Sequence, residues 1–368
     1  MNDTVLITGG AGFIGRALAN ELGQRGHRVR ILDALIDQVH GADPVPPPFP
    51  EGTVFIRGDV RDRAAVEDAL TGATAVVHLA AEVGVGQSMY AIERYTSVND
   101  TGTAVLFEAM IDKPIRRVVT ASSMSIYGEG LYEDADGNPV HDVKRDRAAG
   151  GSWDPTDDQG RSLRPVPTPE SKRPALASVY AIGKYVQERL TLTLAEAYGY
   201  EGVALRLWNV YGPGQALSNP YTGVLAIFAS RIANGQSPMI FEDGEQRRDF
   251  VHVRDVARAF ADALEMPGIS GKVFNIASGT DRSVSDVATA LARAMGSDLT
   301  ARVTGEGRTG DIRHCIADIS AARSAIGFEA REDFDAGLAE LAEWVAQQEA
   351  QDRVDAARDE LKARGLVS

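Results

Sequence analysis

The chain has 368 residues, of which 52 are acidic and 38 basic, giving a formal net charge of −14 at pH 7. This length predicts roughly two domains, or one large α/β domain with a smaller lobe, and the acidic balance argues against nucleic acid or an anionic membrane as a partner. A single cysteine, Cys315, excludes an internal disulfide, and no apolar run reaches the roughly twenty residues that cross a bilayer. With no signal segment at its start, the chain is expected to be cytoplasmic.

Apolar runs typical of strands recur along the chain, near residues 4–8, 29–33, 53–57, 75–80, 116–121, 203–208 and 273–276. Helix-like segments lie between most of them. This alternation predicts an α/β fold with a doubly wound parallel sheet.

A glycine turn follows the first predicted strand, and an apolar-periodic helix follows the turn; the turn reads Thr8-Gly9-Gly10-Ala11-Gly12-Phe13-Ile14-Gly15. These glycines permit a tight turn and close approach of a ligand, and the N–H groups at the helix start attract a pyrophosphate. Asp33 ends the next strand roughly twenty residues later, where its carboxylate can accept from ribose hydroxyls and repel a 2′-phosphate. The pattern predicts NAD as the cofactor, with an ordinary strand-to-helix turn as the alternative.

Three segments after the next strands extend this predicted cofactor site. Asp59, in Gly58-Asp59-Val60, either accepts from the adenine amino group or caps the following helix. The fourth strand runs into Leu79-Ala80-Ala81, whose small side chains let a cofactor pass close by, and His78 before them is interpreted as a buried core residue. Asn99 is interpreted as a support that hydrogen-bonds across the sheet layer.

A second group of residues predicts the chemistry. The strand near 116–121 continues into a serine-rich end with Ser123 and Ser125, and a helix starting near Ser178 carries Tyr180 and Lys184. A tyrosine and a lysine four residues apart share one helix face. Because the ammonium favours phenolate by Coulomb attraction, Tyr180 is a candidate general base, and Ser123 can hydrogen-bond the substrate oxygen. Without the glycine turn, such a pair is common on any amphipathic helix.

Together with the runs 205–214, 248–256 and 308–311, these motifs resemble the extended short-chain dehydrogenase/reductase family, specifically its nucleotide-sugar epimerases and dehydratases. The resemblance covers nearly the whole chain. It implies a cofactor-binding set of Gly9, Gly12, Phe13, Ile14, Gly15, Asp33, Asp59, Val60, Leu79, Ala80, Ala81, Asn99, Tyr180 and Lys184. It implies a catalytic set of Ser123, Tyr180 and Lys184, and a substrate-binding set of Ser123, Ser125, Asn209, Arg248 and Arg308. The last three match positions that hold the diphosphate and nucleotide, since a guanidinium binds phosphate in bidentate fashion; a turn-capping amide and two surface arginines are the alternative.

The pattern beyond the catalytic helix suggests a division of the chain, because residues 210–240 and 277–350 do not continue the regular strand–helix alternation. We expect an NAD-binding Rossmann domain at 1–209 and a substrate-binding lobe mainly at 210–350, with segments near 245–276 returning to the first domain. A long insert near 130–174 is expected to cover the sugar site, or else to be a disordered decoration. The helix pattern from about 333 to 363 is expected to be solvated, and residues 351–368 are expected to form a helical tail.

Met124 and Ser125 narrow the reaction, because they stand where the family's 4,6-dehydratases carry an Asp-Glu pair and its decarboxylases a glutamate. Neither side chain can perform the proton transfers of those reactions. Oxidation at a single carbon needs only the base, the serine and the nicotinamide. We therefore expect a nucleotide-diphosphate sugar 4-epimerase that forms a 4-keto sugar and reduces it on its other face. A 4-ketoreductase and, less favoured, a 4,6-dehydratase or a non-catalytic nucleotide-binding protein are the alternatives.

Two finer expectations also rest on resemblance. The segment 82–90, the run 125–130 and the long insert are similar to dTDP-L-rhamnose 4-epimerases. Family members often pair two helices from each subunit, and the helices near 89–111 and 178–198 would serve here, so a homodimer is expected.

Overall fold

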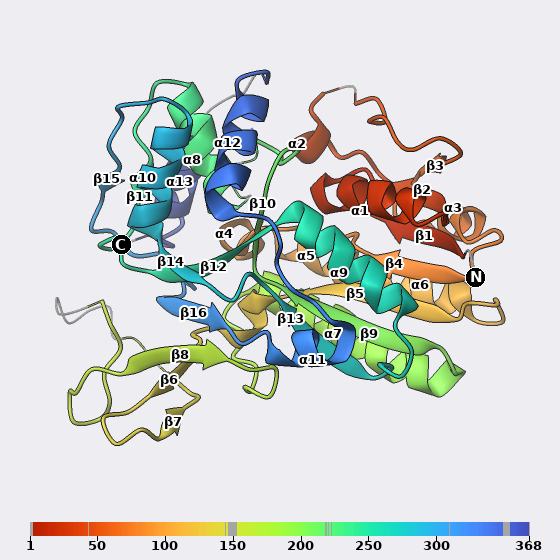
Figure 1. The fold of residues 1–368 in the computed structure, drawn as a ribbon, viewed down its shortest axis with the longest axis horizontal. Coiled ribbons are helices and arrows are strands. Elements are labelled where there is room, and N and C mark those ends of the chain that lie inside the picture. The colour runs from red at the N-terminus through yellow and green to blue at the C-terminus, as the bar shows by residue number, and fades with distance from the viewer. Residues whose placement is uncertain are drawn as a thin grey trace.

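The computed structural model describes residues 3–42, 44–143, 145, 153–217, 219, 221, 223–308, 310–348 and 354–367. Its larger layer is a parallel sheet with the strand order β13-β9-β5-β4-β1-β2-β3 (Figure 1). The strands are β1 (Thr4–Thr8), β2 (Arg28–Asp33), β3 (Val54–Arg57), β4 (Ala75–His78), β5 (Arg117–Ser123), β9 (Glu201–Leu207) and β13 (Lys272–Ile276). The strand order reverses between β1 and β4, and ligands of such sheets bind at the carboxyl ends beside this reversal.

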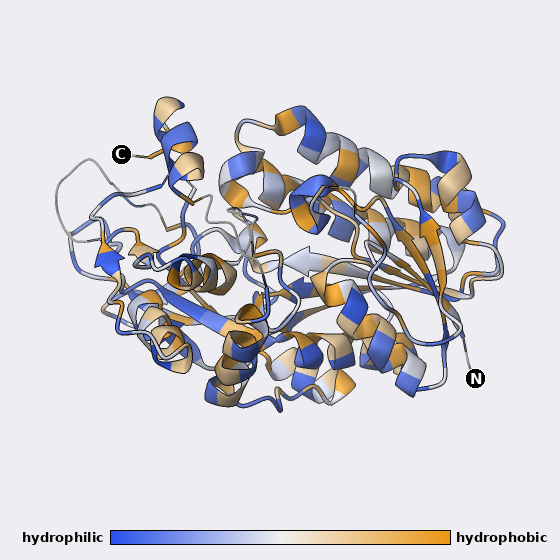
Figure 2. Cartoon of the chain, turned by 90° about the horizontal axis from the view of Figure 1, so that it is seen from above, coloured by the Kyte–Doolittle hydropathy of each residue, from blue (hydrophilic) through white to orange (hydrophobic). Residues whose placement is uncertain are grey.

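The seven apolar runs of the sequence are the seven strands of this sheet, so the predicted doubly wound fold is confirmed. Every residue of β1, β4 and β5 is buried. Helices cover both faces of a parallel sheet, and its strands therefore read as continuous apolar segments. In Figure 2 the apolar strands lie between two layers of helices.

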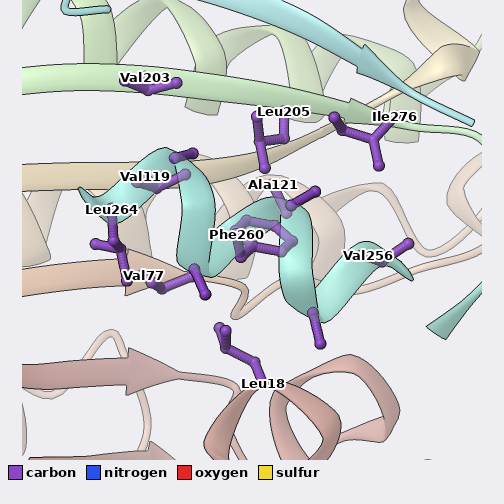
Figure 3. Close-up of a cluster of buried hydrophobic side chains, with 14 of the residues drawn as sticks. Leu18, Val77, Val119, Ala121, Val203, Leu205, Val256, Phe260, Leu264 and Ile276 are labelled. Atoms are coloured by element: carbon purple, nitrogen blue, oxygen red, sulfur yellow. The ribbon is translucent and has the colours of Figure 1, made fainter. Parts of the chain in front are cut away.

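One face of the sheet packs against α1 (Phe13–Gln24), α9 (Val253–Glu265) and α11 (Ser320–Ile326). Figure 3 shows Phe260 of α9 directed at the sheet, beside Val119 and Leu205. The opposite face packs against α3 (Arg63–Ala69), α6 (Gly102–Met110) and α7 (Val179–Tyr198). Burying α7 here fixes the residues near its start at the carboxyl edge of β5.

The second lobe combines short strands with helices. Its sheet has the order β10-β12-β16-β8-β6-β7, and β14 pairs with β12. These strands are β6 (Leu131–Glu133), β7 (Pro139–Val140), β8 (Arg164–Thr168), β10 (Asn209–Tyr211), β12 (Arg247–His252), β14 (Asp281–Ser283) and β16 (His314–Ala317). A separate pair joins β11 (Met239–Ile240) to β15 (Arg302–Val303). Helices α8 (Val224–Ala233), α10 (Val284–Ala294) and α12 (Phe334–Val345) share an apolar core in this lobe.

Shorter elements complete the chain. They are α2 (Asp37–His40), α4 (Val85–Ser88), α5 (Ile92–Thr96), a π-helical turn η1 (Ser97–Thr101), a 3₁₀ turn η2 (Met124–Tyr127) and α13 (Val354–Ala363). In the described parts of the chain, no helix combines the length and apolar character that a membrane span requires.

The expectation for the C-terminal helix pattern is wrong. The expected solvated helix near 333–363 is two helices, and α12 buries Leu338, Leu341 and Val345 against α8 and α10 because these residues recur on one helix face. The described part of the 130–174 insert forms β6, β7 and β8, and none of its residues lines the cavity described below. Residues 144 and 146–152 of the insert, and residues 349–353 and 368 near the C-terminus, lie outside the described residues.

Candidate active site

The backbone around the glycine turn packs so closely that a side chain at Gly9 or Gly15 would clash. Gly9 has a φ of 69°, and a Cβ there would lie 2.8 Å from the backbone nitrogen of Ala80. A Cβ on Gly15 would lie 2.5 Å from the Cα of Gly10, so this glycine permits close packing of α1 on the turn. Gly12 is the N-cap of α1, whose first residues are Phe13 and Ile14. No side chain caps the first N–H groups of this helix. These features fit the pyrophosphate of a dinucleotide.

Asp33 ends β2, and Asp59 follows the end of the neighbouring strand β3 by two residues. Asp33 accepts hydrogen bonds from the backbone N–H groups of Ala11 and Leu35, both at 2.9 Å, so its carboxylate is fixed beside the glycine turn. Asp59 pairs with Arg61 at 2.6 Å, and this hydrogen bond lowers the pKa of its carboxyl group. The helix-cap interpretation of Asp59 is wrong, because Asp62 caps α3 by accepting from the N–H groups at its start.

The segment after β4 is held by buried polar contacts. The Asn99 side chain accepts from the N–H of Glu82 at 2.7 Å and donates to the carbonyl of Glu82 at 3.2 Å, which confirms its supporting contact across the layer. His78 is completely buried between the hydroxyls of Thr8 and Thr103, at 2.7 and 2.8 Å. Burial lowers the pKa of the His78 imidazole to about 3, so this histidine is a neutral core residue, as expected.

The residues of the predicted catalytic set meet where β5 ends beside α7. Ser178 caps α7, its hydroxyl accepting from the N–H of Ala181 at 3.1 Å, and Tyr180 and Lys184 follow one turn apart. Tyr180 forms a hydrogen bond with Ser123, the last residue of β5. Lys184 is buried behind Tyr180 and donates to Oε1 of Gln187 at 2.6 Å.

The expected lowering of the Tyr180 pKa is absent from this arrangement. Burial raises the pKa of the Tyr180 phenol, and the hydrogen bond with Ser123 only opposes that rise. Burial also lowers the pKa of the Lys184 amine to about 7, against the attraction of Glu188. The spacing predicted a shared helix face, but it did not show that Gln187 holds the lysine amine.

Lys184 is supported by a buried network on α7. The Gln187 amide nitrogen lies 3.0 Å from the hydroxyl of Thr103 and 3.1 Å from the carbonyl of Ala80. The Glu188 carboxylate pairs with Arg206 of β9 at 2.7 Å. This network connects α7 to the segment after β4 and to β9, and so fixes the helix that carries the candidate base.

A cavity of about 350 Å³ opens between the two lobes, and six of the predicted residues line it. They are Ser123, Ser125, Tyr180, Asn209, Arg248 and Arg308. The glycine turn and Asp33 lie outside this lining, at the carboxyl edge of β1 and β2. The glycine turn and Asp33, the candidate dinucleotide site, thus lie apart from the lining of the cavity that contains the predicted substrate residues.

The polar side of the cavity carries the two arginines and Asn209. Arg248 donates to the backbone carbonyls of Ile312 and Arg313. Arg308 pairs with Asp311 at 2.8 Å, and its guanidinium lies 4.4 Å from the centre of the Phe241 ring. The Asn209 side chain donates to the carbonyl of Asp249 at 2.9 Å. The contacts of Arg248 are to carbonyl groups, and among the described residues no carboxylate pairs with it, which suits an anionic ligand.

Three buried polar atoms in the cavity wall have no hydrogen-bond partner among the described residues: Oγ of Ser125, Nε1 of Trp208 and Oε1 of Gln246. Buried polar groups are normally hydrogen-bonded, so these unpartnered atoms are unusual features of the cavity wall. Sequence reasoning missed Trp208 and Gln246 as site residues. Trp208 directly precedes Asn209 in a run already singled out, but Gln246 offered no signal of its own.

Comparison with known proteins gives a consistent result. A family model described as "NAD dependent epimerase/dehydratase family" matches residues 5–147 and 157–277. The chain is 35% identical to a dTDP-L-rhamnose 4-epimerase of Burkholderia thailandensis, covering 94% of this chain and 95% of that protein. It is 29% identical to a dTDP-glucose 4,6-dehydratase of Streptomyces niveus, covering 92% of each. A UDP-glucose 4-epimerase of Thermus thermophilus, solved in complex with NAD, superposes with a TM-score of 0.72 at 27% identity, covering 93% of this chain and 99% of that one.

Proposed function

The chain belongs to the NAD dependent epimerase/dehydratase family and is an NAD-dependent enzyme, and from this premise we propose that it is a nucleotide-sugar 4-epimerase. The observation that carries the proposal is the position of Ser123 and Tyr180 in the wall of a cavity whose other side presents Arg248 and Arg308. A sugar with its C4 hydroxyl at Tyr180 would then place its diphosphate toward the arginines.

The proposed roles follow from this geometry. NAD supplies a hydride acceptor and donor when it is bound, with its pyrophosphate at the glycine turn and its adenosine ribose at Asp33. Tyr180 takes the proton of the C4 hydroxyl, and Ser123 hydrogen-bonds the same oxygen. The positive charge of Lys184 stabilises the phenolate. After the 4-keto sugar presents its other face, Tyr180 returns the proton.

Dehydration is disfavoured by the groups around the substrate. Elimination of water requires an acid and a base near carbons 5 and 6, but Met124 and Ser125 occupy the adjoining wall. Asp311 is the one carboxylate among the described lining residues, and both of its oxygens pair with Arg308.

The apolar part of the wall supports a 6-deoxy sugar as the substrate. Val83, Val85, Met89 and Met124 line the cavity together with the indole of Trp208. Aliphatic side chains favour a methyl group at C5 over a hydroxymethyl or carboxylate group, whose hydration they cannot replace. We propose dTDP-L-rhamnose as the first substrate to test.

The test incubates the purified enzyme with dTDP-, UDP- and GDP-sugars without added NADH and follows the C4 epimers by NMR. We expect dTDP-L-rhamnose to reach an equilibrium mixture with its C4 epimer. Reduction of a 4-keto sugar that occurs only with stoichiometric NADH would instead identify a ketoreductase. Loss of water to give a 4-keto-6-deoxy product would identify a dehydratase.

We further propose a homodimer that pairs through α5 and α7. Ile92 on α5 and Ile182 on α7 are 52% and 43% exposed, and exposed apolar side chains on adjoining helices are typical of an interface. Ile182→Arg is expected to convert a dimer into a monomer in size-exclusion chromatography with light scattering. Val45→Arg, at an 80% exposed loop position, is the matched control. A monomeric wild-type enzyme would contradict the proposal.

A further inference from the structure

The C-terminal segment 354–367 forms part of the cavity wall, although it follows the core of both lobes. Ala357, Arg358 and Leu361 of α13 line the cavity, and Leu366 lines it after the helix ends. Leu361 is only 6% exposed. Figure 2 shows this helix, which leads to the C-terminus, at the outer edge of the lobe. The segment therefore closes the cavity from outside.

Ion pairs and one backbone contact attach the segment to the lobe. Glu306 accepts from Arg358 at 2.9 and 2.5 Å and from Lys362 at 2.6 Å. Val367 forms a β-bridge with Arg308, a residue of the polar side of the cavity. The loop 304–311 thus carries both the C-terminal segment and an arginine of the proposed diphosphate site.

The segment also reaches the opposite wall. A Cβ built on Gly86 of α4 would lie 3.4 Å from Cδ1 of Leu361, which places this leucine directly over Gly86. The Arg364 guanidinium lies 4.4 Å from the ring centre of Tyr90. The segment therefore spans the opening of the cavity from the loop 304–311 to the segment 85–90.

Neighbouring contacts place α4, which lies beneath Leu361, between the loop of Arg308 and the start of α7. Cγ1 of Val85, the residue before Gly86, would lie 3.7 Å from a Cβ on Gly310, and the carbonyl of Ala177 would lie 3.4 Å from the same point. Ala177 directly precedes Ser178, the cap of the helix that carries Tyr180. The α4 segment beneath Leu361 is therefore close to the start of α7.

The side chains that the segment presents over α4 and the cavity are mainly aliphatic. Leu361 and Leu366 offer only hydrocarbon, and the charge of Arg358 is matched by the two oxygens of Glu306. Such a surface favours a ligand group that needs no hydrogen bond. Because these ion pairs are accessible to water, each is individually weak, so the segment can move aside to admit a substrate.

We propose that the C-terminal segment 354–367 is a substrate-binding wall that selects sugars with a methyl group at C5, with Leu361 as its specificity-determining residue. This inference rests on the proposed function, since it assigns the sugar of the nucleotide sugar to the cavity. It adds to the site a segment that no motif in the sequence indicated.

The test compares the wild-type NAD-bound enzyme with Leu361→Asn and with Ala356→Asn, which places the same amide on an exposed position of the same helix. Isothermal titration calorimetry measures Kd for dTDP-L-rhamnose, for the C6-hydroxylated dTDP-glucose and for dTDP alone. For Leu361→Asn we expect binding of dTDP-L-rhamnose to weaken about tenfold, because a buried leucine is replaced by a polar side chain. The ratio of the Kd values for the two nucleotide sugars should therefore become smaller. Kd for dTDP alone should change less than about twofold. Ala356→Asn is expected to leave all three values unchanged.

Glu306→Gln provides a second arm, because it weakens the attachment without altering the leucines. We expect a higher KM with little change in kcat, and a smaller salt dependence of KM than in the wild type. Equal weakening of both sugars and of dTDP by Leu361→Asn, or no change in any of them, would overturn the inference. Selective weakening in an enzyme that epimerises none of the sugars would leave this inference standing and overturn the proposed function instead.

Discussion

Tyr180→Phe is expected to lower kcat for C4 epimerisation by about 10²–10⁴-fold, the range that a positioned general base contributes. The substitution removes only the hydroxyl that contacts Ser123 at the cavity wall. The glycine turn and Asp33 make no use of this hydroxyl, so Kd for NAD is expected to stay within about twofold of the wild type. NMR of the sugar product measures kcat, and calorimetry measures Kd for NAD.

The matched control is Tyr185→Phe, which removes a phenolic hydroxyl from the same helix at a position outside the described lining of the cavity. It is expected to keep kcat within about threefold, on the scale of small effects away from the reacting groups. A Tyr180→Phe enzyme that retains a tenth or more of the wild-type kcat would remove Tyr180 from the proposed mechanism. Loss of NAD binding by the same variant would show that the tyrosine acts through the cofactor site.

The pKa values of Tyr180 and Lys184 determine how this proton transfer depends on pH. Burial raises the pKa of Tyr180 and lowers the pKa of Lys184 to about 7 in the protein without NAD. Above that pH the lysine amine is largely neutral and gives less support to phenolate. An additional positive charge beside the phenol would favour phenolate near neutral pH, and the oxidised cofactor carries such a charge.

The large sheet could be predicted from the sequence because its strands are buried on both faces. Because β1 and β4 are buried on both faces, their sequences are nearly continuous apolar runs. The second sheet offered no such signal: β12 begins with Arg247, Arg248 and Asp249, and it is held by pairing with strands distant in the sequence. Its course depends on tertiary contacts rather than on local pattern.

The candidate site likewise contains residues that the sequence could predict and residues that it could not. Ser123, Tyr180 and Lys184 could be placed together because one follows a strand of the large sheet and the others share a helix face. The cavity wall formed by Leu361 could not be predicted, because α13 reaches it through Glu306, about fifty residues earlier in the chain. Nor did the spacing reveal Gln187 as the partner of the lysine amine.

The buried pair of Glu188 and Arg206 is expected to be the most sensitive point of the fold near the site. The Glu188 and Arg206 side chains are 1% and 6% exposed and are joined by two hydrogen bonds, at 2.7 and 2.9 Å. Ser122 donates to the same carboxylate at 2.7 Å, and Arg206 also donates to the Tyr127 hydroxyl at 2.8 Å. Removing one member leaves the other charge buried without its ion-pair partner.

Glu188→Gln is therefore expected to lower the free energy of unfolding by about 3–5 kcal/mol, measured by urea denaturation of the NAD-free protein. Glu67→Gln is the matched control: Glu67 pairs with Arg63 at 2.6 Å, but both side chains are 49% exposed, so its expected loss is below about 1 kcal/mol. The double variant Glu188→Leu with Arg206→Met should recover much of the loss, since it removes both charges together. Equal effects of Glu188→Gln and Glu67→Gln would contradict this account.

The Glu188 charge also raises the pKa of Lys184. Glu188→Gln should therefore lower that pKa below about 7 and weaken the support of the Tyr180 phenolate at neutral pH. The stability of α7 and the proposed chemistry thus depend on the same carboxylate.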